Sequence, residues 1–289
     1  MALFISMSFG CQPIGEEATN KNLNNMNMNQ FNPLAEEDFI NILTQTKTNQ
    51  NWIKISEAIN AKIKFDRFLI SKDRVIGTGV STGNHVNTLT LGGTSIQGTK
   101  RDIGIGIVVV VDLDRNKNIQ NVNVHYSQSA LLSQLGIRPN ENVVLRRINE
   151  TLPTSTIETH NREYAVMIRQ FYDSFASNDE VLKEKIISRD LVVLSHATGS
   201  FSEGIEGHKA FAEQFYENFD VQDVTLSEIS TFDKLVFVNG ALTLMVKKTL
   251  SPIMTEGMII NLSLHDIFEI EGKLITRTEF MHNPVFDDL

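Results

Sequence analysis

Residues 255–284 constrain the fold of this chain more than any other segment. The first half of the segment alternates, and its apolar residues share one parity: Met258, Ile260, Leu262, Leu264, Phe268 and Ile270. Strand side chains point alternately to the two faces of a sheet, so these residues line one face. Glu271, Gly272 and Lys273 then form a tight turn, after which the chain alternates again. The segment therefore predicts two long antiparallel strands joined as a hairpin.

Asp266 has the same parity as these apolar residues. Its carboxylate is therefore expected on the face that its neighbours make apolar. Two interpretations stay open. Either this face is solvated near Asp266, or the carboxylate sits in a pocket that raises its pKa and suits it to proton transfer.

Composition indicates a globular chain with more than one core. The 289 residues are enough for about two domains, and 41% of them are hydrophobic against 21% charged. The net charge of −9 disfavours non-specific attraction to nucleic acid, so no nucleic-acid partner is expected. The single cysteine excludes an internal disulfide and a multi-cysteine metal site.

That cysteine, Cys11, follows a short apolar run and precedes polar, asparagine-rich sequence. This arrangement resembles the end of a bacterial lipoprotein signal, in which the cysteine is lipidated. A basic segment before the apolar run is missing and the run is short for a signal, so an incidental cysteine in an apolar terminus is the alternative. Lipidation would make the protein extracytoplasmic and lipid-anchored in a bacterial envelope, with the anchor as its sole membrane contact. Without lipidation, a cytoplasmic location is the alternative.

The chain divides into four segments. Residues 1–31 comprise the signal remnant and an asparagine-rich tether, which has too little apolar surface to order itself. Residues 32–137 form a first domain, 138–161 a polar, threonine-rich linker, and 162–285 a second domain.

Both domains end in the same order of strands. The first domain predicts one helix over 33–47, followed by strands near 61–69, 74–82, 103–113 and 119–128. The second predicts three helices, the first of which Asn161 caps and the second of which begins at Asp179, and a short strand over 191–194. Four antiparallel strands follow, over 222–231, 234–248, 256–270 and 273–282. The prediction is an α+β protein of two cone-shaped domains, each a curved antiparallel sheet against helices, three in the second domain and fewer in the first.

This element order resembles the nuclear transport factor 2-like superfamily, and within it the SnoaL-like polyketide cyclases and ester cyclases. In the second domain the resemblance rests on Phe171 and Tyr172, on residues 204–207, and on residues 266–274 at the last hairpin. In the first domain, residues 127–136 resemble the ester-cyclase ending, in which an aspartate precedes a Leu-Gly-Leu-Leu-x-Gln-Leu-Gly run. The motifs cover most of residues 35–285, and they specify the fold better than the activity.

Two departures from the family pattern concern function. Ser127 stands where ester cyclases carry their aspartate, and the first domain lacks the two helices that usually close the cone. The resemblance therefore implies a degenerate first domain, which could pack on the second as a pseudo-dimer. Glu279 stands where relatives often carry an aspartate on the last strand.

The resemblance also implies candidate catalytic residues in the second domain. Asp266 matches a carboxylate that donates a hydrogen bond to a substrate oxygen in the ketosteroid isomerase branch. Tyr172 resembles a hydroxyl donor, and His196 or Glu279 would act as the proton acceptor. Each has an ordinary structural alternative: a backbone-bonded aspartate, a core tyrosine, a turn histidine and a solvated strand glutamate.

Two functions stay open. One is a tethered tandem protein whose second cone binds a small hydrophobic molecule without catalysis. The other is a cofactor-independent isomerase or aldol-type cyclase that moves a proton on a carbonyl substrate. Neither requires a cofactor, and the scattered histidines predict no metal site.

Overall fold

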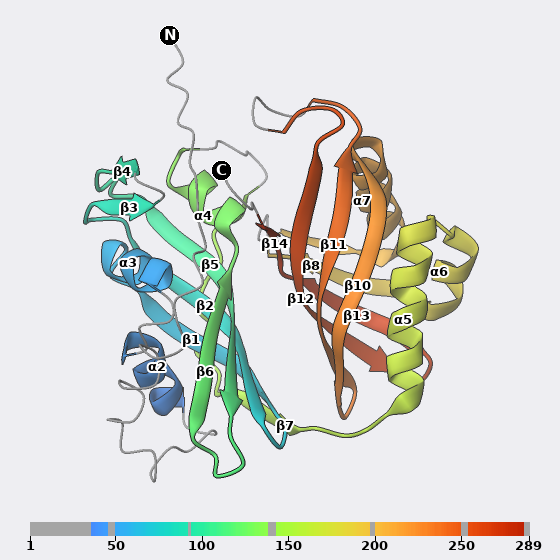
Figure 1. Cartoon of the computed structure of the whole chain (residues 1–289), viewed down its shortest axis with the longest axis horizontal. Helices are drawn as coiled ribbons and strands as arrows, with labels where there is room; N and C mark the ends of the chain where they lie inside the picture. The colour runs from blue at the N-terminus through green and yellow to red at the C-terminus, as the bar shows by residue number, and fades with distance from the viewer. Residues whose placement is uncertain are drawn as a thin grey trace. The chain divides into compact units, whose positions relative to one another are not determined.

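The computed structural model describes residues 36–45, 50–91, 94–137, 143–196, 200–249 and 254–285. Cys11 and the tether lie outside these ranges. The chain forms two compact units that divide between Ile157 and Glu158. Both units combine an extended sheet with helices (Figure 1), so the predicted α+β fold is confirmed.

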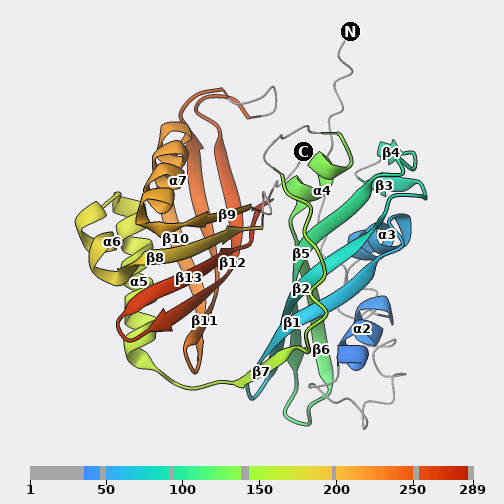
Figure 2. The same ribbon diagram turned by 180° about the vertical axis from the view of Figure 1, so that it is seen from behind.

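The first unit is built on a five-stranded sheet in the order β6-β5-β2-β1-β7. Its elements in chain order are α2 (Glu36–Gln45), α3 (Gln50–Ala58), β1 (Lys62–Ile70), β2 (Arg74–Asn84), β3 (Leu89–Leu91), β4 (Thr94–Ile96), β5 (Asp102–Leu113), β6 (Ile119–Tyr126), α4 (Gln128–Gln134) and β7 (Thr154–Ile157). Strands β1, β2, β5 and β6 form an antiparallel meander, and β7 runs parallel to β1. Figure 2 shows the same unit from behind.

Two features of the first unit differ from the prediction. A second helix, α3, precedes the sheet, and it buries Trp52, Ile55 and Ala58 at helical spacing. Among the described residues the first unit therefore has three helices, as many as the second. Strand β7 lies within the expected linker, and its pairing with β1 assigns this part of the segment to the first unit's sheet.

The second unit has the order of elements that the resemblance implies. They are α5 (Arg162–Ser177), α6 (Glu180–Ile186), β8 (Ile187–Ser195), β9 (Ser200–Glu203), α7 (Gly204–Asn218), β10 (Phe219–Phe232), β11 (Leu235–Val246), β12 (Ile259–Glu271), β13 (Leu274–Phe280) and β14 (His282–Val285). The sheet order is β10-β11-β12-β13-β8-β9, and β14 also pairs with β12. Helices α5, α6 and α7 lie on one side of this sheet in both views (Figures 1 and 2).

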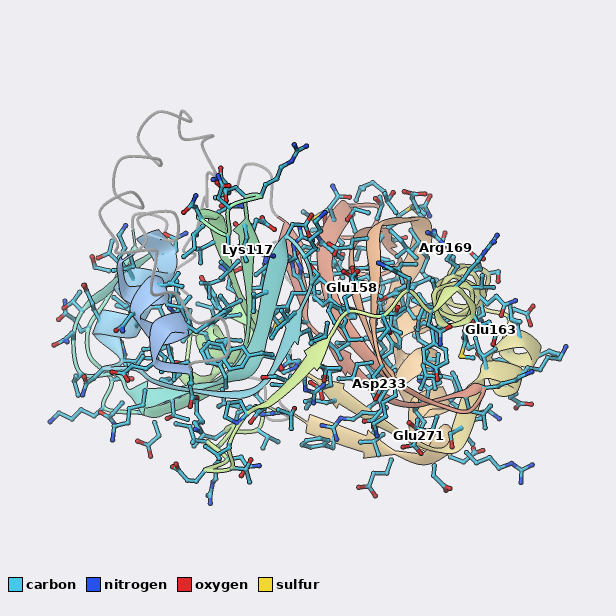
Figure 3. The ribbon with its side chains drawn as sticks, turned by 90° about the horizontal axis from the view of Figure 1, so that it is seen from below. Lys117, Glu158, Glu163, Arg169, Asp233 and Glu271 are labelled. Carbon is cyan, nitrogen blue, oxygen red and sulfur yellow. The ribbon has the colours of Figure 1, made fainter. Side chains whose placement is uncertain are left out.

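Side chains begin and end these helices as the sequence indicates. Asn161 accepts hydrogen bonds from the backbone N–H groups of Glu163 and Tyr164, and Asp179 accepts one from Leu182. Both helix starts were predicted. Figure 3 shows the side chains, with the exposed Glu163 and Arg169 on the outer side of α5.

Each meander bends at a bulge that faces a glycine. In the first unit the bulge between Phe65 and Arg67 lies beside Gly79, where an added Cβ would come within 2.2 Å of the Lys64 carbonyl oxygen. In the second unit the bulge between Leu226 and Glu228 lies beside Gly240, where a Cβ would come within 2.4 Å of the Thr225 oxygen. A bulge sharpens the local twist of a strand, and glycine permits the close backbone approach that follows.

No helix among the described residues is long and apolar enough to cross a membrane.

Candidate functional site

Aromatic rings from three elements fill the interior of the second unit. Phe171 of α5 lies with its ring centroid 5.2 Å from that of Phe268 on β12. Phe280 of β13 lies 6.3 Å from Phe171 and 6.1 Å from Phe268. These rings belong to one buried cluster with valine, leucine and isoleucine side chains of β8, β11 and β12.

Asp266 lies inside this apolar cluster. It shares the face of β12 with Leu264 and Phe268, and its side chain is 0% exposed. The neighbouring residue on β11 is Val238, which is also fully buried. Of the two interpretations of its parity, a solvated face is therefore excluded. The structure places a carboxylate in a dry interior, where it needs hydrogen-bond donors.

Three donors surround the Asp266 carboxylate. The Tyr172 hydroxyl donates to Oδ2 at 2.6 Å, and the backbone N–H of Met281 donates to Oδ1 at 3.0 Å. The Nε2 atom of His282 lies 3.0 Å from Oδ2. The three come from α5, the end of β13 and the start of β14, so the carboxylate ties a helix to the sheet.

Tyr172 acts as a donor at all physiological pH values. Burial raises its pKa well above the ordinary value for tyrosine, and the neighbouring Asp266 carboxylate raises it further. Tyr172 is only 3% exposed, and its hydroxyl donates to Asp266. A ligand would therefore meet Tyr172 already bonded to the carboxylate.

His282 is a residue of this site that was not predicted from the sequence. Its backbone pairs with Leu264, so its side chain shares the interior face with Asp266, and its ring lies 5.2 Å from that of Phe280. Its side chain is 21% exposed, whereas Asp266 is covered completely. His282 shares parity with Phe280, and this signal could have identified it. A partly exposed imidazole held by a buried carboxylate can accept or donate a proton.

His196 and Glu279, the two candidate proton acceptors, do not lie beside Asp266 and Tyr172. Glu279 pairs with Ile267 and with Leu194, so its side chain lies on the opposite face of the sheet from Asp266. His196 lies on that opposite face too, with Nε2 3.9 Å from a Glu279 carboxylate oxygen. Arg277 also binds Glu279, at 3.0 Å.

The cause is a single bulge in the hairpin. Ile270 pairs with Ile275, and without a bulge the same register would place Glu279 opposite Asp266. The irregularity between Glu269 and Ile270 shifts the register by one residue, so Glu269 pairs with Arg277. A shift of one residue moves every later side chain to the other face.

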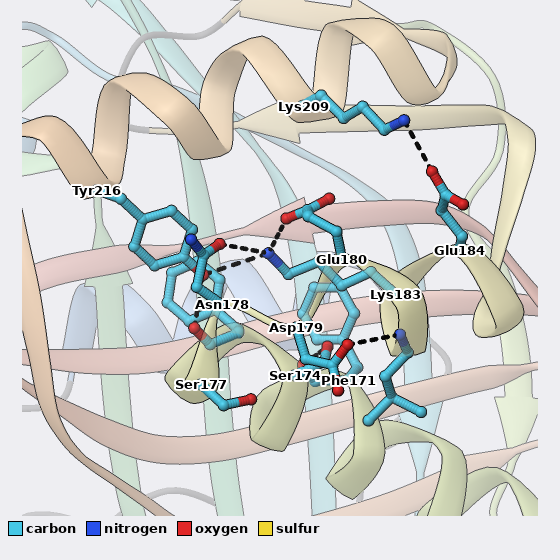
Figure 4. Close-up of polar contacts among 12 residues, drawn as sticks. Phe171, Ser174, Ser177, Asn178, Asp179, Glu180, Lys183, Glu184, Lys209 and Tyr216 are labelled. Atoms are coloured by element: carbon cyan, nitrogen blue, oxygen red, sulfur yellow. Dashed lines mark hydrogen bonds and ion pairs between the residues drawn. The ribbon is translucent and has the colours of Figure 1, made fainter.

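A second polar cluster joins the three helices (Figure 4). The Lys183 ammonium, 2% exposed, lies 2.6 Å from Glu180 Oε1, 3.3 Å from Asn178 Oδ1 and 3.4 Å from the Tyr216 hydroxyl. Tyr216 in turn donates to the Phe175 carbonyl oxygen. Three acceptors satisfy the three protons of the lysine, so this cluster holds α5, α6 and α7 together.

His208 of α7 lies beside this cluster and also faces the aromatic interior. Its ring centroid is 6.4 Å from that of Phe171, and it is 3% exposed. Burial lowers its pKa to about 4, and the positive charge of Lys183 adds to this effect. The imidazole is therefore neutral near pH 7.

The first unit presents no acid at the position that the ester-cyclase resemblance suggested. Ser127 is the N-cap of α4, and its hydroxyl accepts a hydrogen bond from the Ala130 N–H at 3.1 Å. Its role in the structure is that of a helix cap. Among the described residues of the whole chain, no group of three or more histidine, cysteine or acidic side chains is placed to hold a metal ion.

No protein family and no curated protein matches this chain. Solved structures do. IdmH, a putative polyketide cyclase from Streptomyces antibioticus, is 15% identical, with 43% of this chain and 93% of that chain covered and a TM-score of 0.38. A putative SnoaL-like polyketide cyclase from Mesorhizobium loti is 16% identical over 40% of this chain and 97% of its own, with a TM-score of 0.33. An LEH-like epoxide hydrolase of M. tuberculosis is 13% identical over 43% of this chain and 86% of its own, with a TM-score of 0.36.

The order of elements predicted for the second unit, two helices, a strand, a third helix and then four antiparallel strands, is confirmed.

Proposed function

We propose that the second unit binds a small, mostly apolar molecule in its interior and receives one oxygen group of that molecule at His282. The observation that carries this proposal is the buried carboxylate of Asp266, held among phenylalanine rings by Tyr172, by the Met281 N–H and by the partly exposed His282. A polar group that is fixed at one point of an apolar interior gives a ligand orientation as well as affinity.

The apolar lining supports the same function. On the interior face of β12, Asp266 and Leu264 are fully covered, Leu262 is partly exposed, and Ile260 is buried again at 5% exposed. Met258, before the start of β12, and Phe215 of α7 are also partly exposed and pack against the same core. His282 is the register partner of Leu264, and its own side chain is 21% exposed. A ligand that lies on the partly exposed apolar residues would reach His282 with its polar end.

Titration of the full chain with 2-naphthol tests this proposal, because the probe carries one hydroxyl on an apolar ring. We expect saturable binding, and His282→Ala should weaken it about tenfold through the loss of one hydrogen bond. His160→Ala is the matched control, because His160 is exposed and lies outside the interior. Absence of binding to the unaltered chain would reject the proposal.

A second candidate function is proton transfer on a carbonyl compound, as in a cofactor-independent isomerase or cyclase. One observation favours it: the His282 imidazole is partly exposed while Asp266 fixes its Nε2 atom. The imidazole would take a proton from the carbon next to the carbonyl, leaving an enolate, and would return it to another carbon of the same molecule. Such a base works without a cofactor.

Conversion of cyclohex-3-enone to its conjugated isomer, followed by ultraviolet absorbance, tests this candidate. We expect measurable turnover that falls at least a hundredfold in His282→Ala. Turnover that is unchanged in His282→Ala and in Asp266→Ala would exclude the catalytic role.

Location and attachment remain proposals that rest on the sequence. Cys11 lies outside the described residues, and its lipidation would tether the protein to a bacterial envelope as a lipoprotein. Cells labelled with a radioactive fatty acid should incorporate label into the unaltered protein and not into a Cys11→Ser variant. Equal labelling of both would refute the lipid anchor.

A further inference from the structure

Two polar side chains of the second unit's interior have atoms that no other described residue satisfies. Both ring nitrogens of His208 and the Oγ1 atom of Thr278 are buried without a hydrogen-bond partner among the residues that the structure describes. His208 is 3% and Thr278 1% exposed. Buried polar groups in folded proteins almost always have partners, so two such groups in one interior call for an explanation.

The two side chains border the same aromatic cluster as Asp266. Thr278 of β13 is the register partner of Phe268 and shares its interior face. Phe268 packs on Phe171, and Phe171 packs on His208. Asp266 is two residues from Phe268 on the same face, which makes Thr278 its diagonal neighbour across the strands, at about 7 Å. The unsatisfied groups and the Asp266 group therefore lie at separate points around one set of rings.

The chemistry of the two groups fits an oxygen atom of a ligand. A neutral imidazole offers one donor and one acceptor, and a threonine hydroxyl can do either. A hydroxyl or carbonyl oxygen can bond to both groups at once. A charged group is disfavoured, because the Lys183 ammonium near His208 is already paired with Glu180 and the surroundings are apolar.

The rings themselves favour a planar ligand body. Phe171 and Phe280 are nearly parallel at an interplanar angle of 25°, and Phe280 and Phe211 are nearly parallel at 16°. Phe211 is partly exposed, whereas Phe171 and Phe280 are buried. A flat ring that displaced the Phe211 side chain would continue this stack from the surface inwards.

We propose that His208 and Thr278 form a second polar subsite, so that the ligand of this unit is a flat apolar molecule with an oxygen group at each end. One oxygen binds at His282 beside Asp266, and the other binds between His208 and Thr278. This inference rests on the proposed function, because it assumes that the interior of the second unit receives a ligand.

Comparison of 2-naphthol with 2,6-dihydroxynaphthalene tests the subsite in the full chain. The second probe differs by one hydroxyl at the far end of the same ring system. We expect the unaltered protein to bind the diol about tenfold more tightly, the effect of one additional hydrogen bond. Thr278→Val removes the hydroxyl at nearly constant shape, and it should abolish the preference for the diol over 2-naphthol. Thr243→Val is the control, because the Thr243 hydroxyl already donates to Asn261.

Thermal unfolding of the free protein separates a binding role from a structural one. If the Thr278 hydroxyl is unsatisfied until a ligand binds, Thr278→Val should leave Tm unchanged or raise it. A lowered Tm together with an intact preference for the diol would show that the hydroxyl serves the fold alone, and would overturn the subsite. Equal affinity of the unaltered protein for both probes would also overturn it while leaving the proposed function in place. Failure of both probes to bind would reject the proposed function and the subsite together.

Discussion

The two units share a four-stranded meander but differ at one interior position. In the second unit, Asp266 faces Val238 on the neighbouring strand. In the first unit, Val109 faces Gly77 at the corresponding place. In each unit a bulge lies next to the last hairpin of the meander, between Asp112 and Leu113 in the first unit and between Glu269 and Ile270 in the second. Val109 and Asp266 each lie three residues before this bulge, so the two positions correspond.

The difference shows which parts of the interior belong to the fold and which to a site. The first unit fills the position above Gly77 with the rings of Phe39 and Phe65, and it buries Val109 completely. The second unit supplies Tyr172 from its first helix and His282 from its last strand. An acid is therefore no requirement of the meander, and Asp266 is present together with the donors that make it tolerable.

The largest effect is expected when the acid is introduced without its donors. Val109→Asp would bury a carboxylate among Gly77, Phe39 and Phe65, and it should reduce the free energy of unfolding by more than about 5 kcal/mol, enough to unfold many domains. Val109→Ala, which removes volume without adding charge, should be much milder. Urea denaturation followed by circular dichroism measures both. A well-folded Val109→Asp protein would show that the first interior also supplies donors.

Removal of the acid from the second unit comes next. Asp266→Ala leaves the Tyr172 hydroxyl and the Met281 N–H without their acceptor in a dry interior, and it should cost about 3–5 kcal/mol. Asp190→Ala on the exposed part of β8 is the control, with an expected change within about 0.5 kcal/mol. The same denaturation experiment applies. Equal midpoints for the two variants would mean that the Asp266 hydrogen bonds contribute nothing to stability.

The third effect depends on pH. Folding lowers the pKa of His208 from 6.5 to about 4. Between these two pH values His208 is protonated in the unfolded chain and neutral in the folded chain. Stability should therefore fall by about 3 kcal/mol as the pH drops from 6.5 to 4. Lys183 and Glu180 act on the pKa of His208 in opposite directions, Lys183 lowering it and Glu180 raising it.

The variant His208→Leu isolates the contribution of His208 to the pH dependence of stability. Burial also lowers the pKa of His125 in the first unit to about 4, and that residue adds to the same slope. His208→Leu should remove its own share and leave the remainder. Urea denaturation at several pH values between 4 and 7.5 gives the two slopes. Identical slopes would mean that His208 titrates normally in the folded chain.

Ser127 tests the cap that replaces the expected acid. Ser127→Ala removes the acceptor of the Ala130 N–H and should cost about 1 kcal/mol, whereas Ser127→Thr should cost less because threonine keeps a capping hydroxyl without adding a charge to this buried position. Thermal unfolding ranks the two variants. The reverse order would show that Ser127 contributes by something other than capping.

The smallest effect is expected at Ser81. Its hydroxyl is fully buried in the first unit and has no hydrogen-bond partner among the described residues. Ser81→Ala should change the free energy of unfolding by less than about 0.5 kcal/mol, or raise it slightly. A loss above about 1 kcal/mol would reveal a polar network in the first interior that matches the one around Asp266.

Local patterns in the sequence were sufficient for the second unit's architecture. The parity of Asp266, the caps at Asn161 and Asp179, and the last hairpin all follow from spacing within a few residues. The α3 helix was not predicted, although Trp52, Ile55 and Ala58 repeat at helical spacing. Its nine residues stand shortly before a strongly alternating strand, so the helical pattern is short and is followed closely by a pattern of period two.

The composition of the site depended on long-range geometry that spacing alone does not give. The bulge between Glu269 and Ile270 sends Glu279 to the other face, and residue types do not reveal a one-residue shift in register. His282 belongs to the site because β14 pairs with β12 beyond the apparent end of the last strand. The four predicted site residues thus separate into a pair inside the unit and a pair on the opposite face, and their catalytic roles remain predictions.

The glycines at the two bulges have a consequence for how such interiors can change. Curvature at Gly79 and Gly240 is imposed by backbone atoms that approach too closely for any side chain, so it does not depend on what lines the concave surface. Substitutions elsewhere in the interior can then replace aromatic side chains by an acid and an imidazole while the sheet keeps its curvature. One bent scaffold can in this way hold an apolar core in one copy and a core with a buried acid in another.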